Sequence, residues 1–405
     1  MIPISQAIQI VLQHTPKLAS EEVALPETAN RILAEDIIAD TDLPPFDRAQ
    51  MDGYAVRAAD VVNTPAQLKI VGESAAGAGW HREMNSGEAV RIMTGAPVPA
   101  GADAVQRVEL TREPNGAGTV EILESVAAGR SIVKQAAEIK SGEIVLRAGE
   151  DINAQTIATL ASFGYANVKV GQRPRVAVMA TGSELVDVNE KPGRDQIRDS
   201  NNYTIEAYAT LAGATVRRLP LAGDDRDELK RQMEAAVGDC DVLVTSGGVS
   251  MGVYDFTKAA FRDLGAEIFF ERVALRPGKP TVFGRLGKTL IFGLPGNPVS
   301  VAVTFNLFVR AALRAMQGAT ETSLPEFTAV LTRDVKGSQG RESYLPAILR
   351  TDEKGILLAE PLKWGGSSDF VSFARATALI NIPSDAKTIT AGSIVTIMSL
   401  PTRAS

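Results

Sequence analysis

The feature that most constrains the fold is a regular alternation of strand and helix patterns between residues 174 and 318. Three short strand patterns alternate with three helical patterns, in the order 175–180, 202–211, 215–219, 227–237, 241–245 and 255–264, and the patterns at 175–180 and 241–245 are apolar runs typical of buried strands. Such an alternation indicates a mostly parallel sheet with helices on both faces. We therefore predict a central doubly wound α/β domain over residues 173–322, with any ligand at the carboxyl ends of its strands.

The segments on either side of this domain have strand patterns of another kind. Residues 45–140 contain short apolar or β-branched runs between clusters of glycine and proline, which predicts an inserted β-rich domain. Residues 323–405 carry similar runs and predict a small C-terminal β-barrel or sandwich. With 405 residues, the chain is long enough for such a multidomain α/β plus β architecture.

Helical spacing returns in residues 1–44 and 141–172. Apolar residues at helical spacing predict a first helix that starts near Ile4 and is ended by Pro16. We expect a second helix near residues 29–34 and a third that is closed by Gly164. Together these segments predict an N-terminal helical linker domain, elongated, with the β-rich domain inserted between its two parts.

Composition excludes several classes of protein. Cys240 is the only cysteine, so no intramolecular disulfide can form and a cytoplasmic setting is favoured. No apolar stretch is long enough to predict a transmembrane helix, and we expect no membrane partner. The net charge of −6, without a long basic run, argues against nucleic-acid binding. His14 and His81 fit neither zinc spacing nor a hydrolase triad, so catalysis must use carboxylates, cations, hydroxyls or bound metal.

A glycine-rich loop follows the apolar run at 241–245. It reads Thr245-Ser246-Gly247-Gly248-Val249-Ser250-Met251-Gly252. Its glycines and serines let backbone N–H groups approach an anion, and the start of the next helix favours negative charge. Asp255 lies near that helix start, where a carboxylate could hold Mg²⁺ over a bound phosphate or simply cap the helix. The loop therefore predicts phosphate binding.

A second polar loop follows the apolar run at 175–180 and reads Thr181-Gly182-Ser183-Glu184. Because the carboxyl ends of parallel strands share one edge of a sheet, we expect the two loops to converge on a single crevice. Residues 197–201 and 223–225 add polar and acidic groups to loops of the same domain. Asp225 could serve there as a ligand or only as a helix cap.

Two proline-rich turns follow in the same domain. Arg276-Pro277-Gly278-Lys279-Pro280 presents two cations, and Arg272 and Arg285 bring residues 271–285 to a local charge of about +3. That charge suggests either an anionic ligand or a solvated turn. Leu294-Pro295-Gly296-Asn297-Pro298-Val299-Ser300 then leads into a long helical pattern, where its prolines fix the backbone at another helix N-terminus.

The inserted domain carries two short motifs, around Asp52 and Thr94. Asp52 stands beside Gly53, and Thr94 follows a strand pattern and precedes Gly95. Taken alone, these residues favour ordinary turn roles.

Eight segments, taken in order, resemble the molybdopterin molybdenumtransferase family, which is known as MoeA in bacteria and as the E domain of gephyrin. They read Pro44-Pro45-Phe46-Asp47, Met51-Asp52-Gly53-Tyr54-Ala55, Met93-Thr94-Gly95-Ala96, Thr181-Gly182-Ser183-Glu184-Leu185, Asp199-Ser200-Asn201, Ser246-Gly247-Gly248-Val249-Ser250, Pro277-Gly278-Lys279-Pro280 and Leu294-Pro295-Gly296-Asn297-Pro298. One such motif is weak, whereas eight in family order are specific.

The resemblance implies that the central domain is of the molybdopterin-binding type and that the chain is a molybdenum insertase. Adenylylated molybdopterin and molybdate would give molybdenum cofactor and AMP, with Mg²⁺ assisting cleavage of the pyrophosphate bond. It further implies a homodimer of four-domain subunits whose active-site cleft includes the partner's inserted domain. Molybdopterin adenylyltransferase and molybdoenzymes would be further partners.

The resemblance also implies residue roles. Asp52, Glu184, Asp225 and Asp255 would be metal or catalytic carboxylates, and Thr94 would act with Asp52 across the dimer. Substrate-binding residues would be Thr181, Gly182, Asn201, Ser246, Gly247, Gly248, Ser250, Arg272, Arg276, Lys279, Pro295, Pro298, Arg341, Ser367 and Ser368. The family commonly has lysine where Arg276 stands, and arginine keeps the charge with a different geometry. The segment that follows Gly340-Arg341 is also less typical of the family.

Two alternatives stand beside the insertase hypothesis. A molybdopterin adenylyltransferase has a similar glycine loop, but it shares only residues 174–318 and leaves Asp52 and Thr94 without a role. A non-catalytic scaffold that binds a partner peptide is the other, and the carboxylates and Lys279 in the cleft motifs argue against it. Only the insertase hypothesis predicts Mg²⁺-dependent release of AMP from the adenylylated pterin in the presence of molybdate. Nothing in the sequence separates molybdate from tungstate.

Overall fold

The computed structural model describes residues 1–114, 118–223, 225–249 and 256–401. Two of the predicted site residues, Ser250 and Asp255, therefore lie outside the described residues. The chain forms two compact units. Unit 1 comprises Met1–Glu35, Ala148–Ala158 and Ala166–Ser405, and unit 2 comprises Asp36–Arg147 and Thr159–Tyr165.

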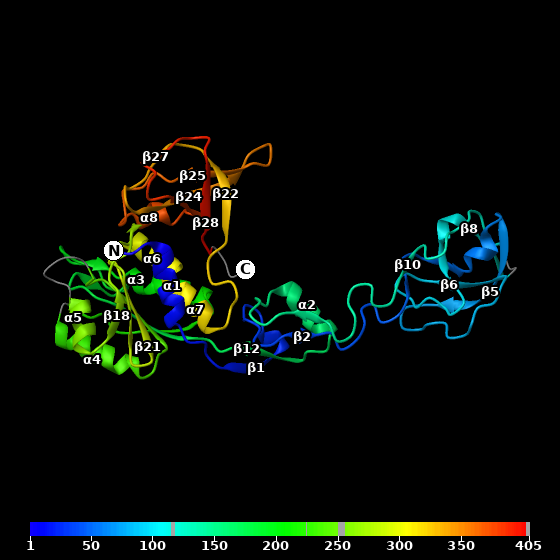
Figure 1. Ribbon diagram of the computed structural model, residues 1–405, viewed down its shortest axis with the longest axis horizontal. Helices are drawn as coiled ribbons and strands as arrows, with labels where there is room; N and C mark the ends of the chain where they lie inside the picture. The colour runs from blue at the N-terminus through cyan, green and yellow to red at the C-terminus, as the bar shows by residue number, and fades with distance from the viewer. Residues whose placement is uncertain (115–117, 224, 250–255, 402–405) are drawn as a thin grey trace. The chain divides into compact units, whose positions relative to one another are not determined.

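Unit 1 is built around a six-stranded sheet in the order β16-β13-β17-β21-β20-β18 (Figure 1). The strands are β13 (Arg175–Ala180), β16 (Thr215–Arg218), β17 (Val242–Ser246), β18 (Glu267–Phe270), β20 (Val282–Leu286) and β21 (Thr289–Leu294). β16, β13, β17 and β21 run parallel, whereas β20 is antiparallel to both of its neighbours. The predicted parallel sheet is confirmed, and the antiparallel edge is an addition that the sequence did not predict.

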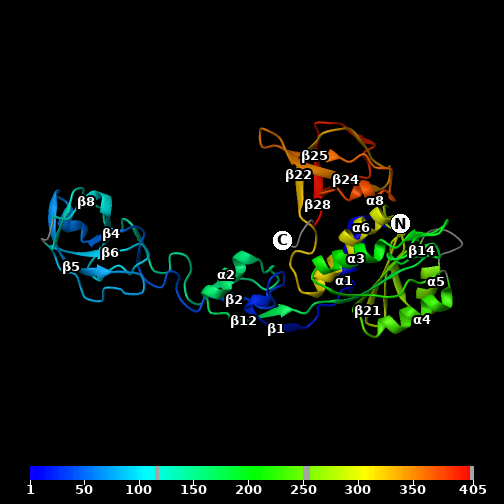
Figure 2. The same cartoon turned by 180° about the vertical axis from the view of Figure 1, so that it is seen from behind.

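Helices cover both faces of this sheet, as Figures 1 and 2 show from opposite sides. They are α3 (Asn201–Leu211), α4 (Arg226–Val237), α5 (Phe256–Asp263), α6 (Pro298–Thr304) and α7 (Arg310–Met316). Side chains of β13 alternate between the two faces: Val176 and Val178 pack in the cluster that contains α3, α6 and α7, whereas Ala177 and Met179 pack with α4 and α5. Because both faces are buried, the strand reads as a continuous apolar run.

The segment Pro298–Met316 is a continuous helix in which a π-helical turn, Phe305–Val309, joins α6 to α7. By length and composition alone it could cross a membrane, but 89% of it is buried inside the protein. It is therefore a core helix of unit 1. α1 (Ile4–His14) packs beside it, and the ring of His14 stacks on Phe269 with 3.7 Å between centroids, so His14 is the packing residue that its isolation in the sequence suggested.

The C-terminal part of unit 1 is a barrel-like sheet, as predicted. Its strands are β22 (Glu326–Leu331), β24 (Glu342–Thr351), β25 (Leu357–Pro361), β26 (Ala378–Ile382) and β28 (Ile394–Ser399). β24 pairs with both β25 and β26, which closes the order β24-β25-β22-β28-β26 around an apolar core. Short elements complete this part and its junction with the α/β sheet: β19 (Leu275–Arg276), β23 (Val335–Lys336), β27 (Thr388–Ile389) and α8 (Phe370–Phe373). Between β13 and α3 of the α/β part, β14 (Leu185–Val186) and β15 (Ile197–Arg198) form a separate parallel pair.

The predicted helix near residues 29–34 is wrong. Asn30 has a φ of 60°, which a right-handed helix does not allow. Ile32 and Leu33 instead form backbone bridges to Asp151 and Val170, and both side chains are buried. The conformation of this segment is set by backbone pairing with residues more than a hundred positions away. A local sequence pattern does not contain that information.

The two other predicted helices of the linker segments form. They are α1 and α2 (Ala154–Ser162), and Gly164 follows α2 with a φ of 75°, as a helix-closing glycine does. The same segments also contain strands, paired as β1 (Ser20–Ala24) with β12 (Asn167–Gly171) and β2 (Ile37–Ile38) with β11 (Ile144–Leu146). They are thus mixed in structure rather than helical throughout.

Unit 2 is β-rich, as predicted, with a six-stranded sheet in the order β7-β4-β6-β5-β9-β8. The strands are β4 (Gly53–Val56), β5 (Ala66–Ser74), β6 (Glu88–Ile92), β7 (Ala104–Arg107), β8 (Thr111–Arg112) and β9 (Thr119–Ile122), with a separate pair, β3 (Arg48–Ala49) and β10 (Ile132–Val133). Gly53 is paired with Ile92, so the start of β4 and the end of β6 meet at one edge. Asp52 and Thr94 extend from that edge.

Candidate active site

The carboxyl ends of three neighbouring strands meet at one edge of the α/β sheet. Ala180 at the end of β13 is in register with Ser246 at the end of β17, and Ser246 is in register with Leu294 at the end of β21. The loops that follow these strands therefore begin side by side. A pocket of about 1080 Å³ opens there, and the predicted convergence of the loops on one crevice is confirmed.

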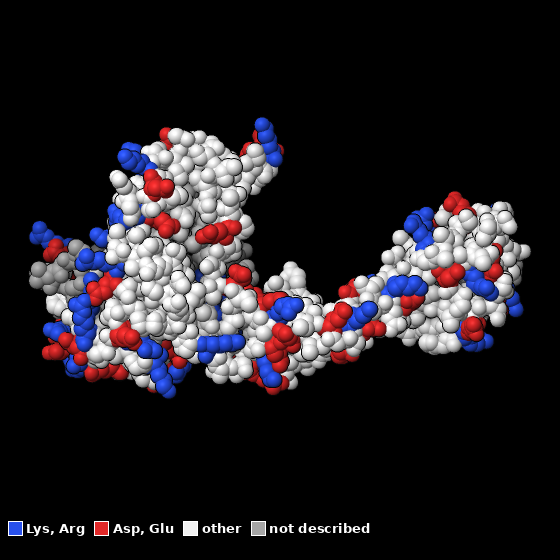
Figure 3. All heavy atoms as spheres, in the orientation of Figure 1, with Lys and Arg blue, Asp and Glu red and all other residues white. Residues whose placement is uncertain are grey.

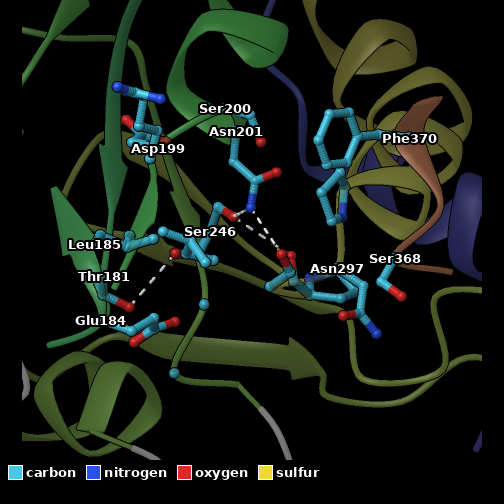
Figure 4. A pocket seen from close by; sticks show the side chains of 18 of the residues that line it. Thr181, Glu184, Leu185, Asp199, Ser200, Asn201, Ser246, Asn297, Ser368 and Phe370 are labelled. Carbon is cyan, nitrogen blue, oxygen red and sulfur yellow. Dashed lines mark hydrogen bonds between the residues drawn. The ribbon is translucent and has the colours of Figure 1, made fainter. Parts of the chain in front are cut away.

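Most of the predicted binding residues of the central domain line this pocket. They are Thr181, Gly182, Glu184, Asn201, Ser246, Gly247, Gly248, Pro295 and Pro298, and Ser368 joins them from the C-terminal part. In the view of Figure 4, Thr181, Glu184 and Leu185 lie on one side of the pocket, Asn297, Ser368 and Phe370 on the other, and Asn201 and Ser246 between them.

Apolar residues that were not among the predicted binding residues also line the pocket, among them Leu185, Val188, Ile197 and Phe370. In the sequence they are indistinguishable from core residues. Val188, Ile197 and Phe370 are exposed in the folded chain, and only this exposure identifies them as part of a binding surface.

Asn201, the first residue of α3, ties two of the pocket loops together. Its Nδ2 donates to Ser246 Oγ at 2.7 Å and to the carbonyl oxygen of Gly296 at 2.8 Å (Figure 4). Because Gly296 offers a carbonyl acceptor, the side-chain amide has only one orientation that makes both bonds. Asn201 thereby fixes the glycine loop after β17 relative to the proline loop after β21.

The glycine loop needs glycine at two positions. Gly247 and Gly248 have φ angles of 95° and 61°, in the left-handed region. A Cβ at Gly247 would lie 2.4 Å from the carbonyl oxygen of Thr181, and a Cβ at Gly248 would lie 2.3 Å from Thr257 Oγ1. These glycines let the loop pack against its neighbours while its backbone forms the turned surface that suits an anion.

A loop from the C-terminal part covers the start of α6. The Val299 N–H donates to the carbonyl oxygen of Ser367 at 3.0 Å, and Asn297 Nδ2 donates to Ser367 Oγ at 2.8 Å. The Val299 N–H at the start of this helix is therefore already bonded to Ser367 and is not available to an anion. The helix start is a docking point for the loop rather than an open anion site.

Asp199 is a buried carboxylate in the pocket wall. Burial raises the pKa of Asp199, and hydrogen bonds from the backbone N–H groups of Asn202 and Asn201 oppose that rise. Its side chain supports the first turn of α3, so we assign it the task of holding Asn201 in place.

Asp225 does not line the pocket. It is the N-cap of α4, where its Oδ1 accepts from the N–H groups of Asp227 at 2.9 Å and Glu228 at 3.1 Å. Within the described part of the chain, Asp225 thus has the contacts of a helix cap. Its role as a metal or substrate carboxylate stays a prediction.

The predicted cationic residues do not gather in one site. Arg276 lines a second cavity of about 480 Å³ together with Arg333, Lys336 and Lys363. Arg285 is engaged by Glu267 at 2.7 Å, which removes it from the predicted cationic group. On the face in Figure 3, positive and negative side chains are interspersed over each unit.

The remaining predicted substrate residues lie near β19. This strand pairs with β24 so that Arg276 is opposite Ser343, and Arg341 immediately precedes β24 with its guanidinium donating to Ser338 Oγ at 3.0 Å. Arg272 is exposed, Lys279 is half-buried, and neither lines the large pocket.

In unit 2, Asp52 and Thr94 form a hydrogen-bonded pair. Hydrogen bonds from the Thr94 backbone and side chain hold the pKa of Asp52 below its usual range, so the exposed carboxylate is ionised at neutral pH. The role of this pair across a dimer stays a prediction.

The four predicted metal carboxylates do not form a metal site in what the structure describes. Within the described ranges, no group of three or more His, Cys, Asp or Glu side chains could hold a metal ion. Glu184 lines the pocket, Asp225 caps α4, Asp52 belongs to unit 2, and Asp255 is not described. The described carboxylates therefore form no all-protein metal cage, and Glu184 is the predicted carboxylate that they bring to the pocket, where Mg²⁺ would also need substrate phosphates as ligands.

Three protein-family models match almost the whole chain. They are described as the MoeA N-terminal region (domain I and II), over residues 2–164, a probable molybdopterin binding domain, over residues 177–315, and the MoeA C-terminal region (domain IV), over residues 328–400.

Relatives and solved structures match over the full length as well. The chain is 36% identical over 404 residues to the molybdopterin molybdenumtransferase of Bacillus subtilis, covering 98% of this chain and 94% of that protein. It is 35% identical to the enzyme of the same name from Haemophilus influenzae, covering 98% of each. A crystal structure of a MoeA protein from Pyrococcus horikoshii superimposes with a TM-score of 0.85 and 30% identity over 99% of this chain and all of that one.

Proposed function

Because the chain belongs to the MoeA family of molybdopterin molybdenumtransferases, its function is the insertion of molybdenum in molybdenum cofactor biosynthesis, and we propose that its substrates are adenylylated molybdopterin and molybdate. The products would be molybdenum cofactor and AMP. The match over the full chain also answers the adenylyltransferase alternative, which accounts only for the central domain.

The observation that supports this substrate is the pocket at the ends of β13, β17 and β21. Its volume of about 1080 Å³ suits a ligand that is larger than a single nucleotide. The turned backbone at Gly247 and Gly248 would hold the phosphates, and Asn201 would keep the glycine loop in the geometry that accepts them.

Mg²⁺ enters the proposal through the family resemblance, because the described side chains form no all-protein metal cage and the ion would be held by one or two carboxylates together with the substrate phosphates. We keep Asp255 and Ser250 as predicted members of the pocket. The direct test is the dependence of AMP release on added Mg²⁺, with EDTA as the control. Release that is equal with and without EDTA would contradict the requirement.

The proposal includes a homodimer in which Asp52 and Thr94 of one subunit complete the pocket of the other. It also includes a cytoplasmic location, with molybdopterin adenylyltransferase and molybdoenzymes as further partners. A mixing experiment tests the shared site: Asp52→Ala and Glu184→Ala change different units, so each variant alone would be inactive. Mixed and reassembled, they should recover about a quarter of wild-type activity, because half of the dimers would carry one intact site of two.

The first experiment on the reaction follows AMP release from adenylylated molybdopterin by the purified protein, with and without micromolar molybdate. Molybdate-dependent release supports the proposed substrates. Binding of the adenylylated pterin without release would favour the scaffold alternative, and no binding would contradict the assignment of this pocket to the pterin.

A further inference from the structure

Two chemically different kinds of side chain line the pocket. Polar groups come from Thr181, Ser246 and the glycine loop. Apolar side chains lie on both sides, with Leu185 and its strand partner Ile197 near Thr181 and the exposed ring of Phe370 opposite, beside Ser368 (Figure 4). A ligand that fills the pocket therefore has an anionic part and a flat or apolar part.

Phe370 is an exposed aromatic residue at the wall of the pocket. It is the first residue of α8, and 53% of its surface is exposed, whereas Phe373 on the same short helix packs against the hydrophobic core of unit 1. In Figure 4 the ring stands at the side of the pocket away from Leu185. An exposed aromatic ring at the wall of a large pocket suits stacking on a planar ligand.

The loop before Phe370 is fixed, so the position of the ring is set in advance. Ser367 is anchored to the start of α6 through Val299 and Asn297, as described above. Asp369 Oδ1 accepts from the Ser372 N–H at 3.0 Å, and Oδ2 accepts from the Gly365 N–H at 2.8 Å. Because this loop is held by hydrogen bonds, the ring of Phe370 can stack on a ligand with little further loss of conformational entropy.

Backbone contacts bear on the direction of the ligand. The Val299 N–H donates to Ser367 and the Gly247 N–H donates to the carbonyl oxygen of Leu294 at 3.1 Å, so we assign the phosphates to the turn at Gly248. The flat part of the ligand then lies toward Phe370.

We propose that Phe370 is a specificity-determining residue that stacks on a planar nitrogen heterocycle of the substrate. This inference rests on the proposed function, because adenylylated molybdopterin carries two such rings, the adenine and the pterin. Both offer the same stacking surface, and the test separates them.

The test measures binding of two separate probes, AMP and pterin-6-carboxylate, to the full-length protein and its variants. Phe370→Ala should weaken the binding of one probe by on the order of ten- to a hundred-fold, and Phe370→Tyr should restore it. The probe that is affected identifies the ring. Val371→Ala is the matched control, because Val371 is on the same helix, is 70% exposed and does not line the pocket.

Three results would overturn the proposal. Unchanged affinity of Phe370→Ala for both probes would refute stacking while leaving the proposed function intact, which AMP release by the same variant would show. An equal loss of affinity in Val371→Ala would also refute it, because the loss would then come from a disturbed α8 and not from the ring of Phe370. A wild-type protein that binds neither probe would overturn this proposal together with the pocket assignment.

Discussion

Asp52 holds Thr94 by two hydrogen bonds that end on the same carboxylate oxygen. Oδ1 accepts from the Thr94 N–H at 2.6 Å and from the Thr94 hydroxyl at 2.8 Å. Asp52 precedes β4 and Thr94 follows β6, so the pair joins two loops at one edge of the unit 2 sheet. Asp52 therefore orders a turn and also presents an ionised carboxylate to solvent.

We expect Asp52→Ala to abolish molybdate insertion while the protein still folds and dimerises, because Asp52 is exposed and not part of a core. Asp52→Asn separates the two roles, since its side-chain oxygen can still accept from the Thr94 N–H but carries no charge. The assay is AMP release, with circular dichroism and gel filtration as controls. Full activity in Asp52→Asn would show that the turn alone matters, and loss of the dimer in Asp52→Ala would show a structural role.

The α/β domain and the convergence of its loops could be predicted because both depend on local pattern and a general rule. The strand at 175–180 is a continuous apolar run, and the structure has β13 at those residues. Once parallel strands are recognised, their carboxyl ends must share an edge, so the meeting of Thr181 with Ser246 follows.

What could not be predicted depends on contacts between distant segments. The segment near residues 29–34 reads as a helix, but the backbone of Ile32 and Leu33 pairs with the chain at Asp151 and Val170. Ser367 contacts the start of α6 although the two are 70 residues apart in the sequence, and neither segment has a pattern that predicts the contact. Phe370 is unpredictable for a related reason, because an aromatic residue among apolar neighbours reads as core until its exposure is known.

Substitutions of Asp225 can separate its role as the cap of α4 from a role of its carboxylate in the reaction. Asp225→Ala should lower the free energy of unfolding by about 1 kcal/mol, because the first N–H groups of α4 lose their acceptor. Asp225→Ser restores a good cap without the charge, so thermal melting should return toward wild type. If the carboxylate also serves the reaction, as we predict, AMP release stays low in Asp225→Ser. Recovery of both stability and activity would show that Asp225 is only a cap.

Gly247→Ala should disturb the pocket for two reasons, the left-handed backbone angle and a clash with Thr181. A left-handed alanine costs about 1–2 kcal/mol wherever it is placed. Gly265 is the matched control, because its φ is 76° and an added Cβ there meets nothing within 4 Å. Gly247→Ala must in addition move the Thr181 carbonyl. We expect both variants to lose stability in urea denaturation but only Gly247→Ala to lose AMP binding, and equal AMP binding in the two would contradict the assigned role of the loop.

Cys240 should be unreactive while the protein is folded. The side chain is 7% exposed, and burial raises the pKa of its thiol to about 11. At pH 8 the reactive thiolate is therefore scarce, and iodoacetamide should label the folded chain far more slowly than the chain in urea. Because the folded pKa lies above the unfolded value of about 8.5, folding favours the neutral thiol, and this contribution to stability is complete below pH 8.5 and lost as the pH rises through 11. The stability of wild type relative to Cys240→Ala should accordingly fall between pH 8 and pH 11, and a constant difference would mean that the thiol is not buried in the folded state.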